Sequence, residues 1–163
     1  MPVLARNKKA HFDYEVLETY EAGLKLLGHE VKSVKNGRMS LKGSFVVLKQ
    51  QGENKLPEFF LINAHIPLYK QAGDIKNYDP YRDRKLLLRK KEVRYLLGKK
   101  QEKGLTLVPI KLYTKHGFIK LEFGLARGKK KYDKREDLKR KDLDRQKREL
   151  LKKKMTRQNL KEL

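Results

Sequence analysis

Alternation of apolar and polar residues runs through residues 1–126 and predicts a body built mainly of β-strands. Phe12, Tyr14 and Val16 alternate with Asp13 and Glu15, which is the period-two pattern of a half-buried strand. Gly23 then allows the chain to bend. This pattern predicts a first strand near residues 12–17.

Two hairpins are predicted further along. The apolar runs 45–48 and 59–62 flank a polar loop that contains glycine, so they read as paired strands. The second hairpin turns at His116-Gly117. Its apolar positions alternate on both sides of that turn: Val108, Ile110 and Leu112 before it, and Ile119, Leu121, Phe123 and Leu125 after it.

Two helices are predicted between and before these hairpins. Residues 83–97 hold six large aliphatic side chains among Arg and Lys, with Pro80 in a preceding turn, Asp83 near the N-cap and Gly98 as a stop. A shorter helix is predicted over residues 30–35, ended by Asn36-Gly37. Several short strands with one or two helices predict a small closed or nearly closed antiparallel β-barrel of the OB type, because closure removes exposed strand edges.

The pattern changes near Gly128, which divides the chain into a body of residues 1–126 and a tail of residues 127–163. The tail has 17 basic and 7 acidic residues, a net charge of +10. Leu143, Leu150, Leu151 and Met155 lie on a broad arc of a notional helix, but this apolar surface is too small to offset the entropy of ordering the chain. We expect the free tail to be disordered with a helical bias, and to fold on RNA.

The net charge of +22 indicates a polyanionic partner, and nucleic acid is the leading candidate. An anionic membrane is the rival, but the sequence has no apolar run of about 18 residues and no signal peptide. We therefore expect a soluble cytoplasmic protein that does not bind membranes.

Catalysis and metal binding find little support in the sequence. Cysteine is absent, and the four histidines are scattered without a local ligand pair. No glycine-rich phosphate loop is present. We expect no enzyme activity, no metal and no cofactor, although a metal-dependent nuclease on the barrel stays open as an alternative.

Four basic or acidic segments are candidate RNA contacts. Residues 128–135 place five cations and Tyr132 after the last strand, where phosphates attract the cations and an unpaired base stacks on the ring; the plain alternative is a solvated linker. The cations of residues 82–89 either contact phosphates or form ion pairs within the protein. Residues 7–11 are basic, and Glu21 either orients a cation or accepts a hydrogen bond from a base, the first being favoured.

Five ordered blocks of the sequence resemble the SmpB family, also called SsrA-binding protein. They are Asn7-Lys8-Lys9-Ala10, Tyr20-Glu21-Ala22-Gly23, Glu30-Val31-Lys32-Ser33, Asp83-Arg84-Lys85-Leu86-Leu87-Leu88 and Gly128-Lys129-Lys130-Lys131-Tyr132-Asp133-Lys134-Arg135. Tyr78 stands where the family often carries histidine. The resemblance implies an OB-type barrel with flanking helices, and a monomer that binds the tRNA-like domain of transfer-messenger RNA (tmRNA). It also implies delivery of that RNA to stalled ribosomes for trans-translation, which rescues the ribosome and tags the incomplete polypeptide.

The resemblance also implies residue roles. By the resemblance, four residues match positions associated with tmRNA binding: Asn7, Lys8, Glu21 and Lys120. We expect six further residues to belong to the same tmRNA-binding set: Lys9, Lys32, Arg82, Arg84, Lys85 and Arg89. The residues implied to anchor the tail at the decoding centre of the ribosomal small subunit are Gly128, Lys129, Lys130, Lys131, Tyr132, Asp133, Lys134 and Arg135. From the helical arc of the tail, we expect Leu150, Leu151 and Met155 to contact the messenger channel. The tail is implied to become helical when bound. A generic tRNA- or rRNA-binding OB-fold protein associated with the ribosome is the alternative function.

Overall fold

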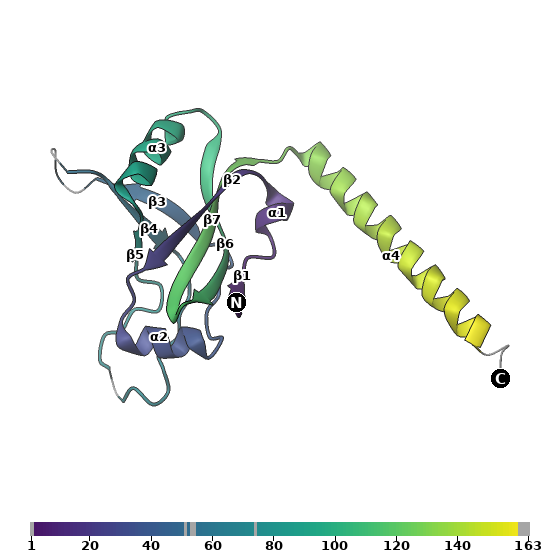
Figure 1. Ribbon diagram of the computed structural model, residues 1–163, viewed down its shortest axis with the longest axis horizontal. Coiled ribbons are helices and arrows are strands. Elements are labelled where there is room, and N and C mark those ends of the chain that lie inside the picture. The colour runs from purple at the N-terminus through teal and green to yellow at the C-terminus, as the bar shows by residue number, and fades with distance from the viewer. Residues whose placement is uncertain (1, 51, 53–54, 74, 160–163) are drawn as a thin grey trace. The chain divides into compact units, whose positions relative to one another are not determined.

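The computed structural model describes residues 2–50, 52, 55–73 and 75–159, and the chain divides into two compact units, residues 1–128 and 129–163. The first unit carries most of the elements (Figure 1): β1 (Val3–Arg6), α1 (Ala10–Asp13), β2 (Tyr14–Leu24), α2 (Gly28–Lys35), β3 (Phe45–Lys49), β4 (Glu58–Ile62), β5 (Arg84–Leu87), α3 (Lys90–Lys100), β6 (Leu105–Lys115) and β7 (Phe118–Gly128). The second unit carries α4 (Lys131–Asn159).

The strands of the first unit form an antiparallel barrel. Their order is β1-β6-β3-β4-β5-β2-β7, and β7 also pairs with β6, so the sheet closes on itself with β1 added at β6. The long strands β2, β6 and β7 form the most extensive pairings, which run from Tyr14↔Gly128 to Gly23↔Lys120 and from Leu105↔Arg127 to Lys115↔Phe118. The expected closed antiparallel barrel is thus confirmed.

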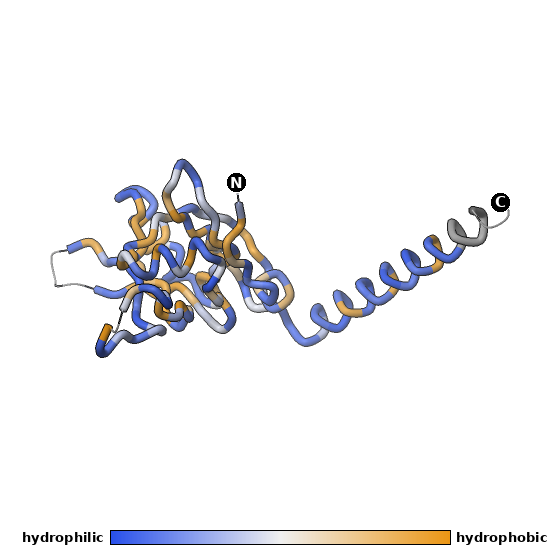
Figure 2. The backbone as a smooth tube through the Cα atoms, turned by 90° about the horizontal axis from the view of Figure 1, so that it is seen from below, coloured by the Kyte–Doolittle hydropathy of each residue, from blue (hydrophilic) through white to orange (hydrophobic). Residues whose placement is uncertain are grey.

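Apolar side chains fill this barrel and attach two helices to it. Leu61, Leu112, Leu121 and Phe123 are fully buried in one core cluster that also contains Val34 of α2 and Leu96 of α3. Figure 1 shows α2 and α3 near opposite ends of the barrel. Figure 2 shows many hydrophobic segments within the first unit, whereas α4 is hydrophilic along most of its length.

Both predicted hairpins are confirmed. Strands β3 and β4 pair from Phe45↔Ile62 to Lys49↔Glu58. In the β6–β7 hairpin, His116 and Gly117 both have positive φ, 49° and 80°, as a two-residue turn with the right-handed strand twist requires. Gly124 of β7 is needed for a different reason, because a Cβ atom there would lie 2.7 Å from Val16 Cγ1 across the bulge in β2.

The helix predicted over residues 83–97 is wrong in its first half. Residues 84–87 form strand β5 between β4 and β2, with Arg84 and Leu86 buried and Leu87 exposed. The short aliphatic run of these residues fits the periodicity of a helix as well as that of a strand. Pairing with two neighbouring strands decided that it forms a strand. The N-cap is Arg89 rather than Asp83, and Glu92 accepts the Arg89 backbone N–H at 2.9 Å.

Three other boundaries also differ from the prediction. The helix α3 continues through Gly98 to Lys100. Lys99 and Lys100 in its last turn interact favourably with the negative end of the helix dipole and so stabilise this extension. The strand predicted near residues 12–17 is the second strand, β2, and begins at Tyr14, because Phe12 belongs to the short helix α1; strand β1 before it was not predicted. The body ends at Gly128, two residues later than expected, because β7 pairs with β2 as far as Tyr14↔Gly128. The short helix before Asn36-Gly37 is confirmed as α2, and Gly37 has a φ of 72°.

The tail is described as one helix, α4, over Lys131–Asn159. Leu150 and Leu151 are 61% and 60% exposed, so these apolar side chains contribute little burial to it. A helix without a buried face depends on local interactions, which are weak in water. The disorder expected of the free tail therefore stays a prediction.

Candidate nucleic-acid interface

Glu21 lies at the centre of a group of charged side chains on β2, β6 and β7. Its carboxylate accepts a hydrogen bond from the Tyr113 hydroxyl. The Lys115 Nζ lies 3.1 Å from one of its oxygens, and the Lys120 Nζ lies 3.8 Å from the other. The predicted residues Glu21 and Lys120 are therefore brought together, as an orienting role for Glu21 requires. We call Glu21, Tyr113, Lys115 and Lys120 the Glu21 cluster.

The electrostatics of this cluster keep Glu21 ionised. The hydrogen bond from Tyr113 lowers the pKa of the Glu21 carboxyl, and the hydrogen bond and charge of Lys115 lower it further. Burial and the same hydrogen bond raise the pKa of Tyr113. A single carboxylate thus orients two ammonium groups, each of which keeps further N–H donors for a phosphate or a base.

Asn7 fixes the course of the N-terminal segment. It is 9% exposed, its Nδ2 donates to the Pro109 carbonyl at 3.0 Å, and its backbone N–H donates to the Ile110 carbonyl at 2.8 Å. Its Oδ1 accepts the Lys9 N–H at 3.2 Å. The polar groups of Asn7 are used within the protein, so this residue acts by positioning the two lysines that follow it.

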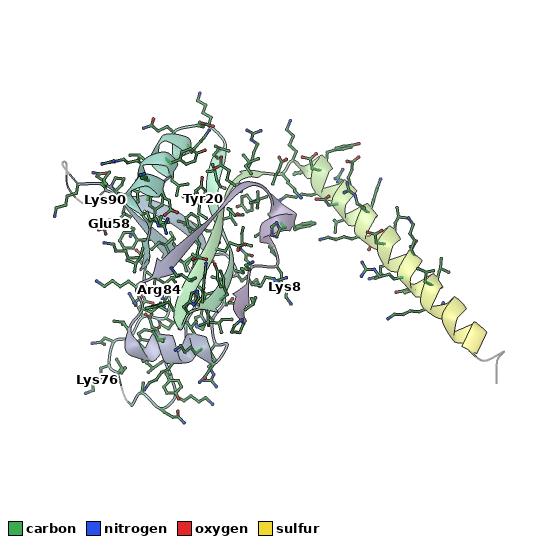
Figure 3. The ribbon with its side chains drawn as sticks, viewed as in Figure 1. Lys8, Tyr20, Glu58, Lys76, Arg84 and Lys90 are labelled. Atoms are coloured by element: carbon green, nitrogen blue, oxygen red, sulfur yellow. The ribbon has the colours of Figure 1, made fainter. Side chains whose placement is uncertain are left out.

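A basic hollow lies beside this segment. It has a volume of about 290 Å³, and Lys8, Lys9 and Lys42 are among its lining residues, together with Arg6. Figure 3 shows Lys8 pointing outward from the barrel. The hollow is of a suitable size and charge for a backbone phosphate.

Glu30 and Arg84 form a buried ion pair, and both side chains are 0% exposed. Arg84 Nη2 and Nε lie 2.8 and 3.0 Å from Glu30 Oε1. The remaining donors of Arg84 reach the carbonyls of Ala64, Arg82 and Pro80 at 2.6 to 2.9 Å. This arrangement ties α2 to β5 and to the loop that precedes it.

Two further side chains complete the surroundings of Glu30. Arg82 also pairs with its carboxylate, with Nε 2.9 Å from Oε1. The Tyr78 hydroxyl lies 3.1 Å from Oε1 and 2.8 Å from the Ile66 carbonyl, and these two acceptors share its single O–H donor. Burial by itself raises the pKa of Glu30, but the hydrogen bonds from Arg82 and the Leu27 N–H, with the charge of Arg84, outweigh it and lower the pKa. Tyr78 therefore has a structural role in this chain.

The structure divides the predicted cations of residues 82–89. The prediction that Arg84 contacts tmRNA is wrong, because its side chain has no exposed surface and its donors are engaged within the protein. Arg82 is partly buried against Glu30, Lys85 pairs with Glu58, and Arg89 is exposed. Lys32 lies apart on α2, with its Nζ 5.7 Å from the Tyr69 ring centroid.

The predicted residues of the tail fall at the junction and on α4. Gly128 is the last residue of β7, and Tyr132 is exposed. Asp133 accepts the Lys130 N–H at 3.1 Å, and Lys129 pairs with Asp137 at 2.7 Å, so these residues stabilise the start of the helix. Lys131, Lys134 and Arg135 lie in its first turns, whereas the side chain of Met155 lies outside the described residues.

Sequence reasoning missed Tyr113 and Lys115, which hold Glu21. The feature of the sequence that could have identified them is the period-two pattern of β6, which puts Lys111, Tyr113 and Lys115 on one side of the strand. Lys111 also pairs there with Glu122 at 3.0 Å. The cross-strand register that brings this row against Glu21 and Lys120 comes from the folded barrel.

The part of the chain that the structure describes holds neither a cluster of metal-ligating side chains nor a membrane-spanning helix. No group of three or more His, Asp or Glu side chains there converges as a metal site. Among the same residues, no helix is both long and apolar enough to cross a membrane.

Comparisons with known proteins agree on one family. The family model described as "SmpB protein" matches residues 4–153. The SsrA-binding protein of Geobacillus kaustophilus (strain HTA426) is 54% identical over 144 residues, covering 88% of each chain, and that of Enterococcus faecalis (strain ATCC 700802 / V583) is 51% identical, covering 88% of this chain and 89% of the relative. A solved structure described as "tmRNA-SmpB: a journey to the center of the bacterial ribosome" superposes with a TM-score of 0.61 at 49% identity, covering 80% of this chain and 87% of that one.

Proposed function

This chain belongs to the SmpB family, and from that membership we propose that it binds the tRNA-like domain of tmRNA and delivers it to stalled ribosomes. The result is trans-translation, in which the ribosome is rescued and the incomplete polypeptide is tagged. The observation that carries this proposal is the 49% identity to a solved SmpB structure whose description names both tmRNA and the ribosome. A cytoplasmic location, a monomer and the absence of catalysis are parts of the same proposal.

The tmRNA contacts are proposed to centre on the Glu21 cluster and the N-terminal lysines. Lys115 and Lys120 are held by one carboxylate, and Lys8 and Lys9 are held by the turn at Asn7. Cations in fixed positions match the phosphates of a folded RNA by shape, with less need for base readout. Arg89 and Lys32 are exposed and stay proposed as separate contacts, whereas the buried Arg84 supports the barrel from within.

The tail is proposed to act after tmRNA is bound. Its cations meet ribosomal RNA phosphates, whose charge relieves the repulsion among them and permits helix propagation. Residues 128–135 are the proposed anchor at the decoding centre, and Leu150, Leu151 and Met155 the proposed contact with the messenger channel. The exposure of Leu150 and Leu151 supports this proposal, since it leaves both side chains available to such a partner.

A pull-down of total cellular RNA on the full chain at near-physiological salt tests the function. We expect strong enrichment of tmRNA over tRNA and rRNA fragments, because electrostatic binding without selectivity is weakened by salt. A broad mixture of RNAs would instead support the alternative, a generic RNA-binding protein of the ribosome. RNA cleavage that depends on divalent metal would revive the nuclease hypothesis and contradict the proposal.

A further inference from the structure

The helix α3 carries a strongly basic surface that the contacts proposed above leave unused. Residues 89–103 include seven Lys or Arg and two Glu, a net charge of +5 in 15 residues. Lys90, Lys91 and Arg94 are all exposed, and at 100° per residue they lie within one 100° arc of the helix. We call these three residues the α3 face.

The cations of the α3 face form no ion pair within the part of the chain that the structure describes, and the carboxylates of the surrounding elements have other partners. Asp83 pairs with Lys49, Glu58 with Lys85 and Glu102 with Lys99. Glu92 accepts the Arg89 N–H, and Glu18 accepts the hydroxyls of Tyr20 and Tyr95. The α3 face therefore differs from the Glu21 cluster, where the lysines are already paired.

The helix holds these cations in fixed positions. Leu96 is fully buried in the core, Val93 packs against that core, and the Tyr95 hydroxyl donates to Glu18 at 3.0 Å. Lys90 and Arg94 are one turn apart, about 6 Å along the axis. A rigid row of unpaired cations suits the phosphate backbone of an RNA helix, which proteins bind by shape and charge.

The α3 face is also separate from the surface proposed for tmRNA. Tyr95 of α3 contacts Tyr20, with ring centroids 6.4 Å apart, and Tyr20 precedes Glu21 on β2. Consecutive residues of a strand point to opposite faces of the sheet, so α3 lies on the face away from Glu21. Figure 3 shows Lys90 and Lys8 on opposite sides of the barrel.

We propose that the α3 face is an RNA-binding surface of the barrel in addition to the tail, and that it binds the phosphate backbone of ribosomal RNA while tmRNA occupies the Glu21 side. This inference rests on the proposed function, since it is the delivery of tmRNA that brings the barrel, and not only the tail, next to ribosomal RNA. The tmRNA and the tail would already position the protein on the ribosome, so the α3 face needs to contact only phosphates and not to read bases.

The test compares two triple variants of the full chain. Lys90→Gln, Lys91→Gln and Arg94→Gln together neutralise the α3 face. The control, Lys25→Gln, Lys35→Gln and Arg38→Gln, also removes two Lys and one Arg, all exposed and located around α2. Binding to purified ribosomes without tmRNA, and separately to tmRNA without ribosomes, is measured over a range of KCl concentrations.

We expect the α3 variant to bind ribosomes at least about tenfold more weakly near 0.1 M KCl, with the difference shrinking as salt rises. The slope of log K against log salt should become shallower by about 0.9 for each lost phosphate contact, so by up to about 2.7. The control variant should stay within about threefold of wild type on ribosomes, and the α3 variant within about threefold on tmRNA, since neither loses a proposed contact.

Other outcomes overturn the proposal. Equal losses in both variants would mean that only total charge matters, and no loss in the α3 variant would mean a solvated face. A loss on tmRNA instead of ribosomes would assign the surface to tmRNA. A charge-conserving variant, Lys90→Arg, Lys91→Arg and Arg94→Lys, guards against misfolding, and its failure on ribosomes would also contradict the idea. If wild type failed to bind tmRNA, the proposed function would fall, while the ribosome measurements would still report on the α3 face.

Discussion

Replacing Arg84 by Met should strongly destabilise the barrel. Met fills similar space without any donor, so two contacts to Glu30 and the hydrogen bonds to three carbonyls are lost. Removing one partner of a buried ion pair costs about 3–5 kcal/mol. Glu30 keeps Arg82, Tyr78 and the Leu27 N–H, which limits the cost, so we expect about 4 kcal/mol. That is a large part of the roughly 5–15 kcal/mol that stabilises a typical domain.

Lys85, the next residue of β5, offers a matched control. It pairs with Glu58 at the partly exposed surface, where such pairs contribute at most about 1 kcal/mol, so Lys85→Met should change little. Urea unfolding followed by tyrosine fluorescence suits this chain, which has eight Tyr and no Trp. With a slope of about 2 kcal/mol per molar urea, Arg84→Met should lower the midpoint by about 2 M relative to wild type. Midpoints within about 0.5 M for the two variants would refute the reasoning.

Three further predictions concern RNA binding and the tail. Glu21→Gln should reduce the selectivity for tmRNA over other RNAs by about tenfold, the equivalent of one charge-assisted hydrogen bond, in competition gel shifts; tighter binding with unchanged selectivity would contradict the orienting role. A chain ending at Gly128 should keep most of its tmRNA affinity at near-physiological salt in the same assay, because the proposed contacts lie in the barrel. Leu151→Asp with Met155→Asp should bind tmRNA normally but fail to support tagging, and NMR of the free protein should show poorly dispersed amide signals after about Gly128; normal tagging, or a tail helix stable in the free protein, would sink this account.

Contacts that are local in sequence were readable from the sequence. Both hairpins follow from alternating apolar residues around short polar turns, and the His116-Gly117 turn adopts the positive φ values that its residues favour. The division near Gly128 follows from composition, because a tail with a net charge of +10 and few apolar residues lacks the surface for a core. The family resemblance rested on ordered motifs, and the relatives confirm it.

Only the tertiary structure decided the features that depend on long-range pairing. The sequence of residues 84–87 is compatible with a helix or a strand. These residues form a strand because they pair with β2 on one side and β4 on the other. That same register buried Arg84 against Glu30, 54 residues earlier, and so converted an apparent RNA contact into a structural one. Likewise, Tyr113 and Lys115 meet Glu21 only because the barrel closes β7 against both β2 and β6. The pattern of a sequence indicates which face of a strand a side chain lies on. Its partner on the neighbouring strand depends on strand order and register, which only the closed sheet determines.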